Sequence, residues 1–339
     1  MTSLKIYNRT QINKIIVKRP GESKFGTNVQ LLSNVRHIYD QLSRLDVMYV
    51  IFGIPEDVGI FANYGKSGSS SAWDAAIKVL LNTQDNIYND AKKVLLLGHL
   101  EFKKELEIVA QLNQKRKKDV QKARELTAQI DKEVTYLVQL IVKAGKIPIV
   151  IGGGHNNAYG NIKGASLALN SPINVINLDA HTDFRNEEGR HSGNGFSYAY
   201  SEGFLKNYFI FGLHENYTSN AILTKLNKLK SIKYNTYEAI EIRKDLKFSS
   251  EINKALKHIA SKPYGIEIDC DAIENVPSSA MTPSGFSVTK ARRFVHYFGK
   301  HENARYLHIC EAAPKKKQQQ QVGKLLSYLI TDFIRANSK

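Results

Sequence analysis

The sequence predicts an α/β protein built around one mainly parallel sheet with helices on both of its faces. Short apolar runs alternate with longer amphipathic stretches along the 339 residues, and this is the pattern of strands joined by crossover helices. Most of the apolar runs have no polar face, as expected for strands that helices cover on both sides. No Gly-, Ser- or Pro-rich linker divides the chain. A single sheet-containing domain is therefore the favoured organisation.

The elements follow from hydrophobic periodicity. Strands are predicted at residues 47–52, 94–97, 147–151, 173–178, 208–211, 264–268 and 306–309. Helices are predicted at residues 71–82, 119–144, 250–260, 289–298 and 322–336. Residues 1–40 are set apart as an N-terminal extension, and residues 41–339 are predicted to form the catalytic domain.

The charge of the chain is strongly positive. Lysine and arginine number 48 against 32 aspartates and glutamates, a formal net charge of +16, and such a surplus attracts nucleic acid or anionic metabolites. Only two short basic clusters occur, at residues 115–118 and 315–317, and neither is interleaved with aromatic residues. These features disfavour nucleic acid as a partner. A basic nucleic-acid-binding protein with a relict fold is kept as the rival class.

The sequence also predicts where the protein works. No run approaches the roughly 20 apolar residues of a membrane span, and the N-terminus lacks the apolar core of a secretory signal. The two cysteines, Cys270 and Cys310, lie in apolar runs, which suits a reducing compartment. A cytoplasmic protein without membrane contact is expected.

Three segments place polar residues directly after apolar strands. They are residues 151–157 (I-G-G-G-H-N-N), 177–185 (N-L-D-A-H-T-D-F-R) and 266–271 (I-E-I-D-C-D). In an open α/β sheet the carboxyl ends of the strands form the ligand crevice. All three segments are therefore expected to meet at one place.

These segments contain four carboxylates and two imidazoles that point to a metal site. Alternate residues of an extended chain project to the same side, which groups Asp179 with His181 and Asp183, and Asp269 with Asp271. The triple glycine allows an unusual turn that brings His155 close. Four acids packed together raise one another's pKa unless cations neutralise them. Oxygen ligands with some imidazole suit Mn²⁺, with Fe, Co or Zn as alternatives, and two such ions make water a strong nucleophile for hydrolysis.

The G-G-G-H, D-A-H-T-D and D-C-D segments resemble the three metal-binding signatures of the ureohydrolase superfamily, which includes arginase, agmatinase and formimidoylglutamase. The resemblance covers roughly residues 45–335. It implies a three-layer α/β/α arginase-like fold and a centre of two Mn²⁺ per subunit. One ion would be held by His155, Asp179, Asp183 and Asp269, and the other by Asp179, His181, Asp269 and Asp271.

The resemblance also implies roles for residues around the metals. The family hydrolyses C–N bonds at amidine-type carbons. Asp183 matches the carboxylate that accepts a hydrogen bond from the attacking hydroxide, and Glu311 matches the glutamate that grips the amidine or guanidinium group. Arg185 is similar to the arginine that formimidoylglutamases have at this place, where arginase has a small amide residue. A guanidinium here would bind a substrate carboxylate and repel cationic substrates.

A loop at residues 191–196 (H-S-G-N-G-F) resembles the family's substrate loop. Asn194 is expected to contact a substrate carboxylate. His191 is a candidate proton shuttle, and an uninvolved loop histidine is the alternative interpretation.

The chain also departs from the family's pattern. Glu267 stands where the S-x-D-x-D signature has serine, Glu274-Asn275 replaces an aspartate-proline pair, and Gly154 replaces the more common aspartate before His155. We interpret the change at Gly154 as one in the surroundings of the metal ligands.

The sequence therefore predicts a dinuclear manganese hydrolase most similar to formimidoylglutamase. The expected substrate is a small anionic amidine, N-formimidoyl-L-glutamate, cleaved to L-glutamate and formamide in histidine degradation. An agmatinase, arginase or guanidino-acid hydrolase that releases urea is the alternative. The family further implies a possible homo-oligomer.

Overall fold

The structure is a computed structural model that describes residues 3–338. Its strands are β1 (Leu4–Ile6), β2 (Tyr49–Gly53), β3 (Val94–Leu100), β4 (Ile147–Ile151), β5 (Ile173–Leu178), β6 (Leu205–Leu213), β7 (Ile232–Thr236), β8 (Tyr264–Asp269) and β9 (Ala304–Cys310). They form one sheet in the order β1-β3-β2-β4-β9-β8-β5-β6-β7. Every neighbouring pair is parallel except β1 with β3. The predicted mainly parallel sheet is confirmed.

The helices were only partly predicted. They are α1 (Arg9–Ile15), α2 (Phe25–Asn28), α3 (Ile38–Arg44), α4 (Val58–Ala62), α5 (Ala72–Leu80), α6 (Lys103–Val109), α7 (Lys117–Lys143), α8 (Asn157–Leu169), α9 (Gly195–Ser201), α10 (Asn220–Lys228), α11 (Phe248–Ile259), α12 (Val288–Gly299) and α13 (Gln319–Asn337). The five predicted helices correspond to α5, α7, α11, α12 and α13. All seven predicted strands are present, and the sequence interpretation missed only the edge strands β1 and β7.

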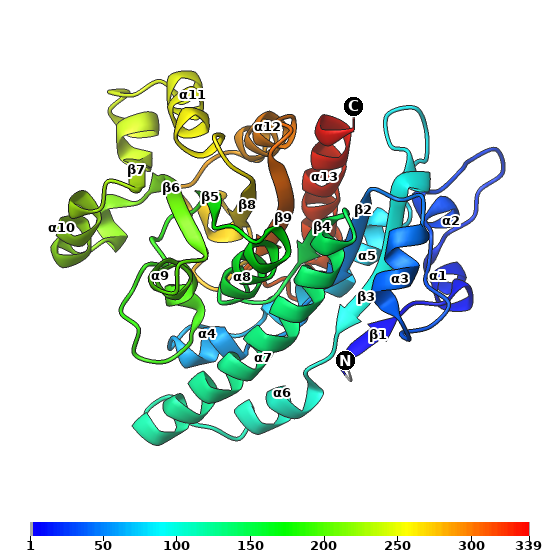
Figure 1. The fold of residues 1–339 in the computed structure, drawn as a ribbon, viewed down its shortest axis with the longest axis horizontal. Helices are drawn as coiled ribbons and strands as arrows, with labels where there is room; N and C mark the ends of the chain where they lie inside the picture. The colour runs from blue at the N-terminus through cyan, green and yellow to red at the C-terminus, as the bar shows by residue number, and fades with distance from the viewer. Residues whose placement is uncertain (1–2, 339) are drawn as a thin grey trace.

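Two apolar cores lie on opposite faces of the sheet. One core packs α1, α2, α5, α11, α12 and α13 against the sheet, and the other packs α3, α4, α6, α7, α8, α9 and α10 against the opposite face. Figure 1 shows the long α7 crossing one face beside α8. The three-layer α/β/α architecture is confirmed. It leaves the strand ends as the place where polar side chains can gather.

The N-terminal segment takes part in the fold. Strand β1 pairs antiparallel with β3, so that Leu4 lies opposite Leu100, and Ile12 of α1 is fully buried. The boundary at residue 40 stays a prediction.

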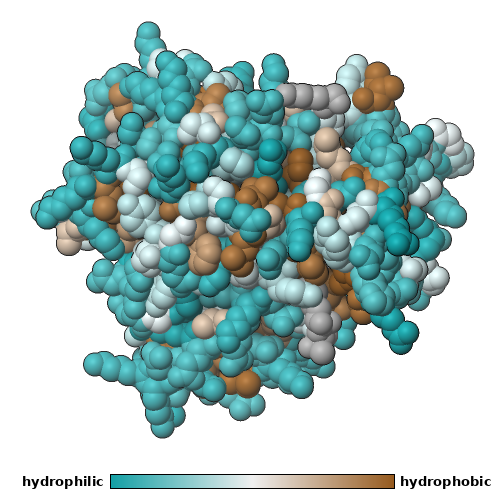
Figure 2. All heavy atoms as spheres, in the orientation of Figure 1, coloured by the Kyte–Doolittle hydropathy of each residue, from teal (hydrophilic) through white to brown (hydrophobic). Residues whose placement is uncertain are grey.

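The surface in Figure 2 is mostly hydrophilic, with apolar residues in small separate groups. Within residues 3–338, no helix combines the length and apolar character that crossing a membrane requires.

Candidate metal centre

The polar side chains gather at the carboxyl ends of four adjacent strands. In the sheet β4, β9, β8 and β5 are consecutive neighbours. His155 and Asp179 follow β4 and β5, Asp269 is the last residue of β8, and Glu311 follows β9. The chain passes from β4 to β5 through α8, while β9 and β8 fill the space between them. Such a switch in strand order is where α/β sheets form a ligand crevice.

Glycines form the turn that delivers His155 to this crevice. Gly152 and Gly153 have φ angles of 88° and 76°, values that favour residues without a Cβ. A Cβ on Gly153 would lie only 2.4 Å from Asn157 Nδ2. The chain can therefore turn sharply between β4 and α8, and the His155 side chain is fully buried at the crevice.

Glu56 stabilises this turn through hydrogen bonds, and the sequence interpretation missed this residue. This fully buried carboxylate accepts hydrogen bonds from Asn157 Nδ2 (2.7 Å), Asn156 Nδ2 (3.2 Å) and the Gly154 backbone N–H (3.2 Å). A Cβ on Gly154 would lie 2.6 Å from Asn156 Oδ1. The departure at Gly154 thus makes room for an amide network around the turn.

One imidazole nitrogen faces three carboxylates. His155 Nδ1 lies 3.2 Å from Asp179 Oδ2, 2.9 Å from Asp183 Oδ2 and 3.1 Å from Asp269 Oδ2. A single ring nitrogen carries at most one proton, which cannot serve three acceptors at once. The ligand atoms of His155 and the three aspartates all lie within 4.8 Å of one another. This is the arrangement expected of residues that hold one cation.

A second group adjoins the first. Ligand atoms of His181, Asp269 and Asp271 also lie within 4.8 Å of one another. The two oxygens of Asp179 face different histidines, because Oδ2 lies 3.2 Å from His155 Nδ1 and Oδ1 lies 3.6 Å from His181 Nδ1. Asp269 belongs to both groups. The geometry therefore places Asp179 and Asp269 where each could contact two ions.

The electrostatics of the cluster favour cations. Burial and the neighbouring Asp271 and Asp179 carboxylates raise the pKa of Asp269 well above its usual range. Divalent cations would remove this repulsion, and carboxylate oxygens with imidazole nitrogens match Mn²⁺ and similar ions. The residues present therefore fit a pair of divalent cations.

The extended conformation expected after β5 is wrong. Strand β5 ends at Leu178, and Asp183 has a φ of 42° in the left-handed region. Asp179 and Asp183 still reach the same nitrogen of His155, but through an irregular loop. Asp271 likewise lies in a helical turn, η6 (Cys270–Ala272), and not in a strand.

A cavity of about 370 Å³ opens over the cluster. The residues that line it include His181, Asp183, Asp269 and Asp271 of the cluster and also Arg185 and Glu311. Glu311 is buried, and its Oε1 accepts the His155 backbone N–H at 2.7 Å. Its Oε2 is also buried and has no hydrogen-bond partner among the described residues. A residue that lines the cavity thus holds a carboxylate oxygen without a hydrogen-bond partner among the described residues, beside the metal ligands.

Arg185 lies at the open side of the same cavity. Its side chain is 49% exposed, and its Nη2 lies 3.9 Å from Glu188 Oε1. Its Nη1 donates a 2.6 Å hydrogen bond to Asn63 Oδ1. Asn63 is neutral, and Glu188 Oε1 lies closer to Arg124 Nη2, at 3.0 Å. Much of the charge of the Arg185 guanidinium is therefore available to an anion in the cavity.

The structure does not bring His191 and Asn194 into the cavity. Both are fully buried, and neither lines it. Burial and the charge of Arg185 lower the pKa of His191 to about 3, so this histidine stays neutral at the pH where a shuttle would have to gain and lose a proton. Asn194 donates to Asn186 O and Gly189 O and accepts from the His191 backbone N–H. The geometry favours a loop-fixing role for both residues over the predicted shuttle and substrate contacts.

Arg190 anchors this loop from inside the protein, and no sequence signal singled it out. Its Nε donates to Asp131 Oδ2 at 2.8 Å, and its Nη2 donates to Asn156 O at 2.9 Å. Its guanidinium carbon lies 4.8 Å from the centre of the Tyr159 ring. The side chains of both Arg190 and Asp131 are almost completely buried.

Arg190→Leu is expected to lower the free energy of unfolding by about 3–5 kcal/mol, because it leaves the Asp131 carboxylate buried without its counter-charge. Urea unfolding would measure the change. Arg185→Ala in the same loop is the matched control. That exposed arginine should change stability by no more than about 0.5 kcal/mol. Equal losses in the two variants would contradict the anchoring role of Arg190.

Fold and site together define an α/β protein with a cluster of residues that could hold a pair of cations. The model of the arginase family matches residues 47–334, and the chain belongs to this family. The resemblance drawn from the three segments is confirmed.

Individual relatives agree with this assignment. A formimidoylglutamase of Hahella chejuensis is 30% identical over 189 residues, which cover 53% of this chain and 51% of that protein. A formimidoylglutamase of Streptococcus pyogenes is 26% identical over 238 residues, covering 68% of this chain and 66% of the relative. The chain thus matches about half of the first protein's length and about two thirds of the second's.

Solved structures share the fold. The formiminoglutamase of Trypanosoma cruzi with Mn²⁺ has a TM-score of 0.71 at 19% identity, covering 93% of this chain and 98% of that one. The formimidoylglutamase of Bacillus subtilis has a TM-score of 0.74 at 15% identity, covering 94% of this chain and 93% of that one. The arginase-like fold is therefore confirmed.

Proposed function

We propose that this protein hydrolyses N-formimidoyl-L-glutamate to L-glutamate and formamide with two Mn²⁺ per chain. The observation that carries the proposal is a single cavity with three kinds of group. It joins ligands for two cations, a free carboxylate oxygen of Glu311 and the guanidinium of Arg185. The first would activate water, the second would bind an amidinium, and the third would bind a carboxylate. The names of the relatives support the same substrate.

His155, Asp179, Asp183 and Asp269 would hold one ion, and Asp179, His181, Asp269 and Asp271 the other. Bound divalent cations lower the pKa of water and so supply a nucleophile at neutral pH. Glu311 Oε2 pairs with the amidinium and fixes the planar carbon in the cavity. Asp183 borders the same space and takes the proton of the attacking water. Glutamate then leaves through its amine nitrogen once that nitrogen is protonated, and formamide keeps the oxygen of the water.

Charges in a neighbouring chamber support an anionic substrate. A second chamber of about 920 Å³ shares His181, Tyr217 and two further residues with the first cavity. Lys66 and Lys315 line this chamber, and among residues 3–338 no aspartate or glutamate does. Together with Arg185 they attract carboxylates and repel a cation such as agmatine. This charge pattern favours formimidoylglutamate, which has two carboxylates, over agmatine, which has none.

A substrate screen tests the proposal directly. The protein loaded with Mn²⁺ would be given formimidoylglutamate, arginine, agmatine and guanidinobutyrate, with formamide and urea as the measured products. Formamide from the first compound at a rate far above that of urea from the others is expected. Urea as the main product would replace the proposed substrate. No hydrolysis together with nucleic-acid binding at physiological salt would favour the rival class.

Arg185→Ala is expected to raise KM for formimidoylglutamate about 10–100-fold, because a hydrogen bond to a charged group contributes about 1.5–3 kcal/mol. Any residual agmatine hydrolysis should not fall, since the cation loses a repulsive neighbour. Arg335→Ala on α13 is the control, as a half-exposed arginine remote from the cavity. An unchanged KM in Arg185→Ala would remove the basis for a dicarboxylate substrate.

We further assign this reaction to histidine degradation in the cytoplasm. Cys270 and Cys310 are both free and buried, which suits a reducing compartment. Assembly into a homo-oligomer stays a prediction.

A further inference from the structure

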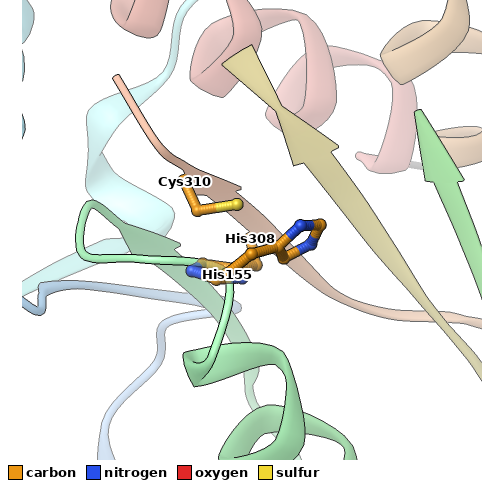
Figure 3. A group of neighbouring side chains, drawn as sticks. All are labelled: His155, His308 and Cys310. Carbon is orange, nitrogen blue, oxygen red and sulfur yellow. The ribbon is translucent and has the colours of Figure 1, made fainter. Parts of the chain in front are cut away.

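A second buried polar cluster lies behind the metal ligands, on the side of His155 that faces away from the aspartates. It consists of Glu267 on β8 and of Tyr306 and His308 on β9, and all three are fully buried. Glu267 and His308 are register partners on the paired strands. Figure 3 shows His308 and Cys310 on their strand next to His155. None of these residues lines the proposed substrate cavity.

Glu267 is held at both of its oxygens. His308 Nδ1 lies 2.6 Å from Oε2, and the Tyr306 hydroxyl donates to Oε1 at 2.7 Å. His155 Nε2 lies 3.5 Å from the same Oε2. Within residues 3–338, histidines are the only ion-pair partners of this carboxylate.

A carboxylate without lysine or arginine is costly at such burial, so its position calls for an explanation. His155 offers that explanation. Its Nδ1 faces three aspartates, while its Nε2 has no hydrogen-bond partner among the described residues. Histidines that bind metals usually donate their other N–H to a carboxylate, which fixes the tautomer and the ring orientation. Glu267 Oε2 lies 3.5 Å from that nitrogen.

We propose that Glu267 positions His155 for metal binding by accepting its Nε2–H, and that Tyr306 and His308 hold Glu267 in place. This inference rests on the metal centre of the proposed function. It gives a role to the glutamate that replaces the serine of the family signature. Glu267 is a positioning residue, since it lies behind the imidazole and away from the cavity.

The same region offers a competing arrangement. Ligand atoms of His155, His308 and Cys310 also lie within 4.8 Å of one another, and two nitrogens with one sulfur suit zinc or copper(I) better than manganese. We favour the positioning role because His155 Nδ1 faces three aspartates. An imidazole that binds a cation through this nitrogen carries a proton on Nε2 and cannot bind a second ion there. Tight Zn²⁺ binding by the wild-type protein that Cys310→Ser abolishes and Asp179→Ala does not would overturn it.

The test measures Mn²⁺ affinity and not activity alone. Metal-free wild-type protein, Glu267→Gln and Glu267→Ala would be titrated with Mn²⁺ by calorimetry. Glu267→Ala should bind one of the two ions about 10–100-fold more weakly, and Glu267→Gln should lose less because its amide oxygen can still accept. Electron paramagnetic resonance should then show isolated Mn²⁺ in place of a coupled pair at limiting metal. Glu267→Gln also serves if the alanine variant does not fold.

Glu251→Gln is the matched control, because Glu251 is a buried carboxylate on α11 that pairs with Asn235 and Lys254. It should bind both ions like the wild type. Wild-type affinity for both ions in Glu267→Ala would overturn the positioning role alone. A wild-type protein that binds two Mn²⁺ but hydrolyses no amidine would overturn the proposed function and leave this inference standing. Absence of Mn²⁺ binding by the wild type would overturn both.

Discussion

Asp179→Ala and Asp269→Ala are each expected to abolish the binding of both metal ions and to lower kcat at least about 10³-fold. The reason is geometric, because each carboxylate lies where it could contact two ions. Asp179 directs one oxygen to each histidine, and Asp269 belongs to both ligand groups. A bound ion pair supplies several kcal/mol of transition-state stabilisation, which corresponds to the stated loss in rate. Metal content per chain after dialysis would be measured beside the rate.

Thermal unfolding gives an independent readout of the same prediction. Mn²⁺ at about 100 times its Kd should stabilise the wild type by about 2.7 kcal/mol for each site, and this gain should be missing from both variants. Asp332→Ala is the control, since Asp332 is a buried aspartate on α13 that pairs with Arg292. It should lose stability yet still gain from Mn²⁺. Wild-type metal content in both Asp179→Ala and Asp269→Ala would disprove the shared positions of these carboxylates.

The central strands could be predicted because they are apolar on both faces and bounded by polar residues. The prediction failed where packing overrides local propensity. Helix α8 contains Gly160 and Gly164, which disfavour a helix in isolation. In the structure a Cβ on Gly160 would lie 2.7 Å from Val134 Cγ1, and a Cβ on Gly164 would lie 2.6 Å from Thr135 O, both on α7. The glycines therefore allow close helix packing, a property of the partner helix that the local sequence does not contain.

The polar residues of the site fall into two groups in the same way. Those at strand ends, such as His155, Asp179 and Asp269, could be predicted because a buried strand end excludes polar residues without a function. Glu267 and His308 lie within buried strands, where the sequence shows each only as a single polar residue among apolar ones. The register of β8 with β9, which the sequence does not reveal, places them side by side. His191 and Asn194 lie in a loop whose position predicted substrate contact. In the structure, His191 Nδ1 accepts the Gly193 backbone N–H and Asn194 Oδ1 accepts the His191 backbone N–H, contacts that the local sequence does not reveal.

Glu311→Gln is expected to lower kcat/KM for formimidoylglutamate about 10²-fold, the equivalent of roughly 3 kcal/mol for a hydrogen bond between charged groups. The substitution is nearly isosteric. The side-chain oxygen that accepts the His155 backbone N–H at 2.7 Å can be kept, so the turn that carries this ligand should not move. What is lost is the negative charge that faces the amidinium.

The metal ions matter for this result, since burial and the neighbouring Asp269 and Asp271 raise the pKa of Glu311 well above its usual range. Bound cations offset that repulsion, so Glu311 is expected to carry its charge only in the loaded enzyme. Glu311→Gln should therefore keep two Mn²⁺ per chain and lose only affinity for the amidinium of the substrate. The remote Glu251→Gln should keep both the metal ions and the affinity for substrate. Loss of Mn²⁺ together with activity would instead identify Glu311 as part of the metal support, and an unchanged kcat/KM would exclude it from amidine binding.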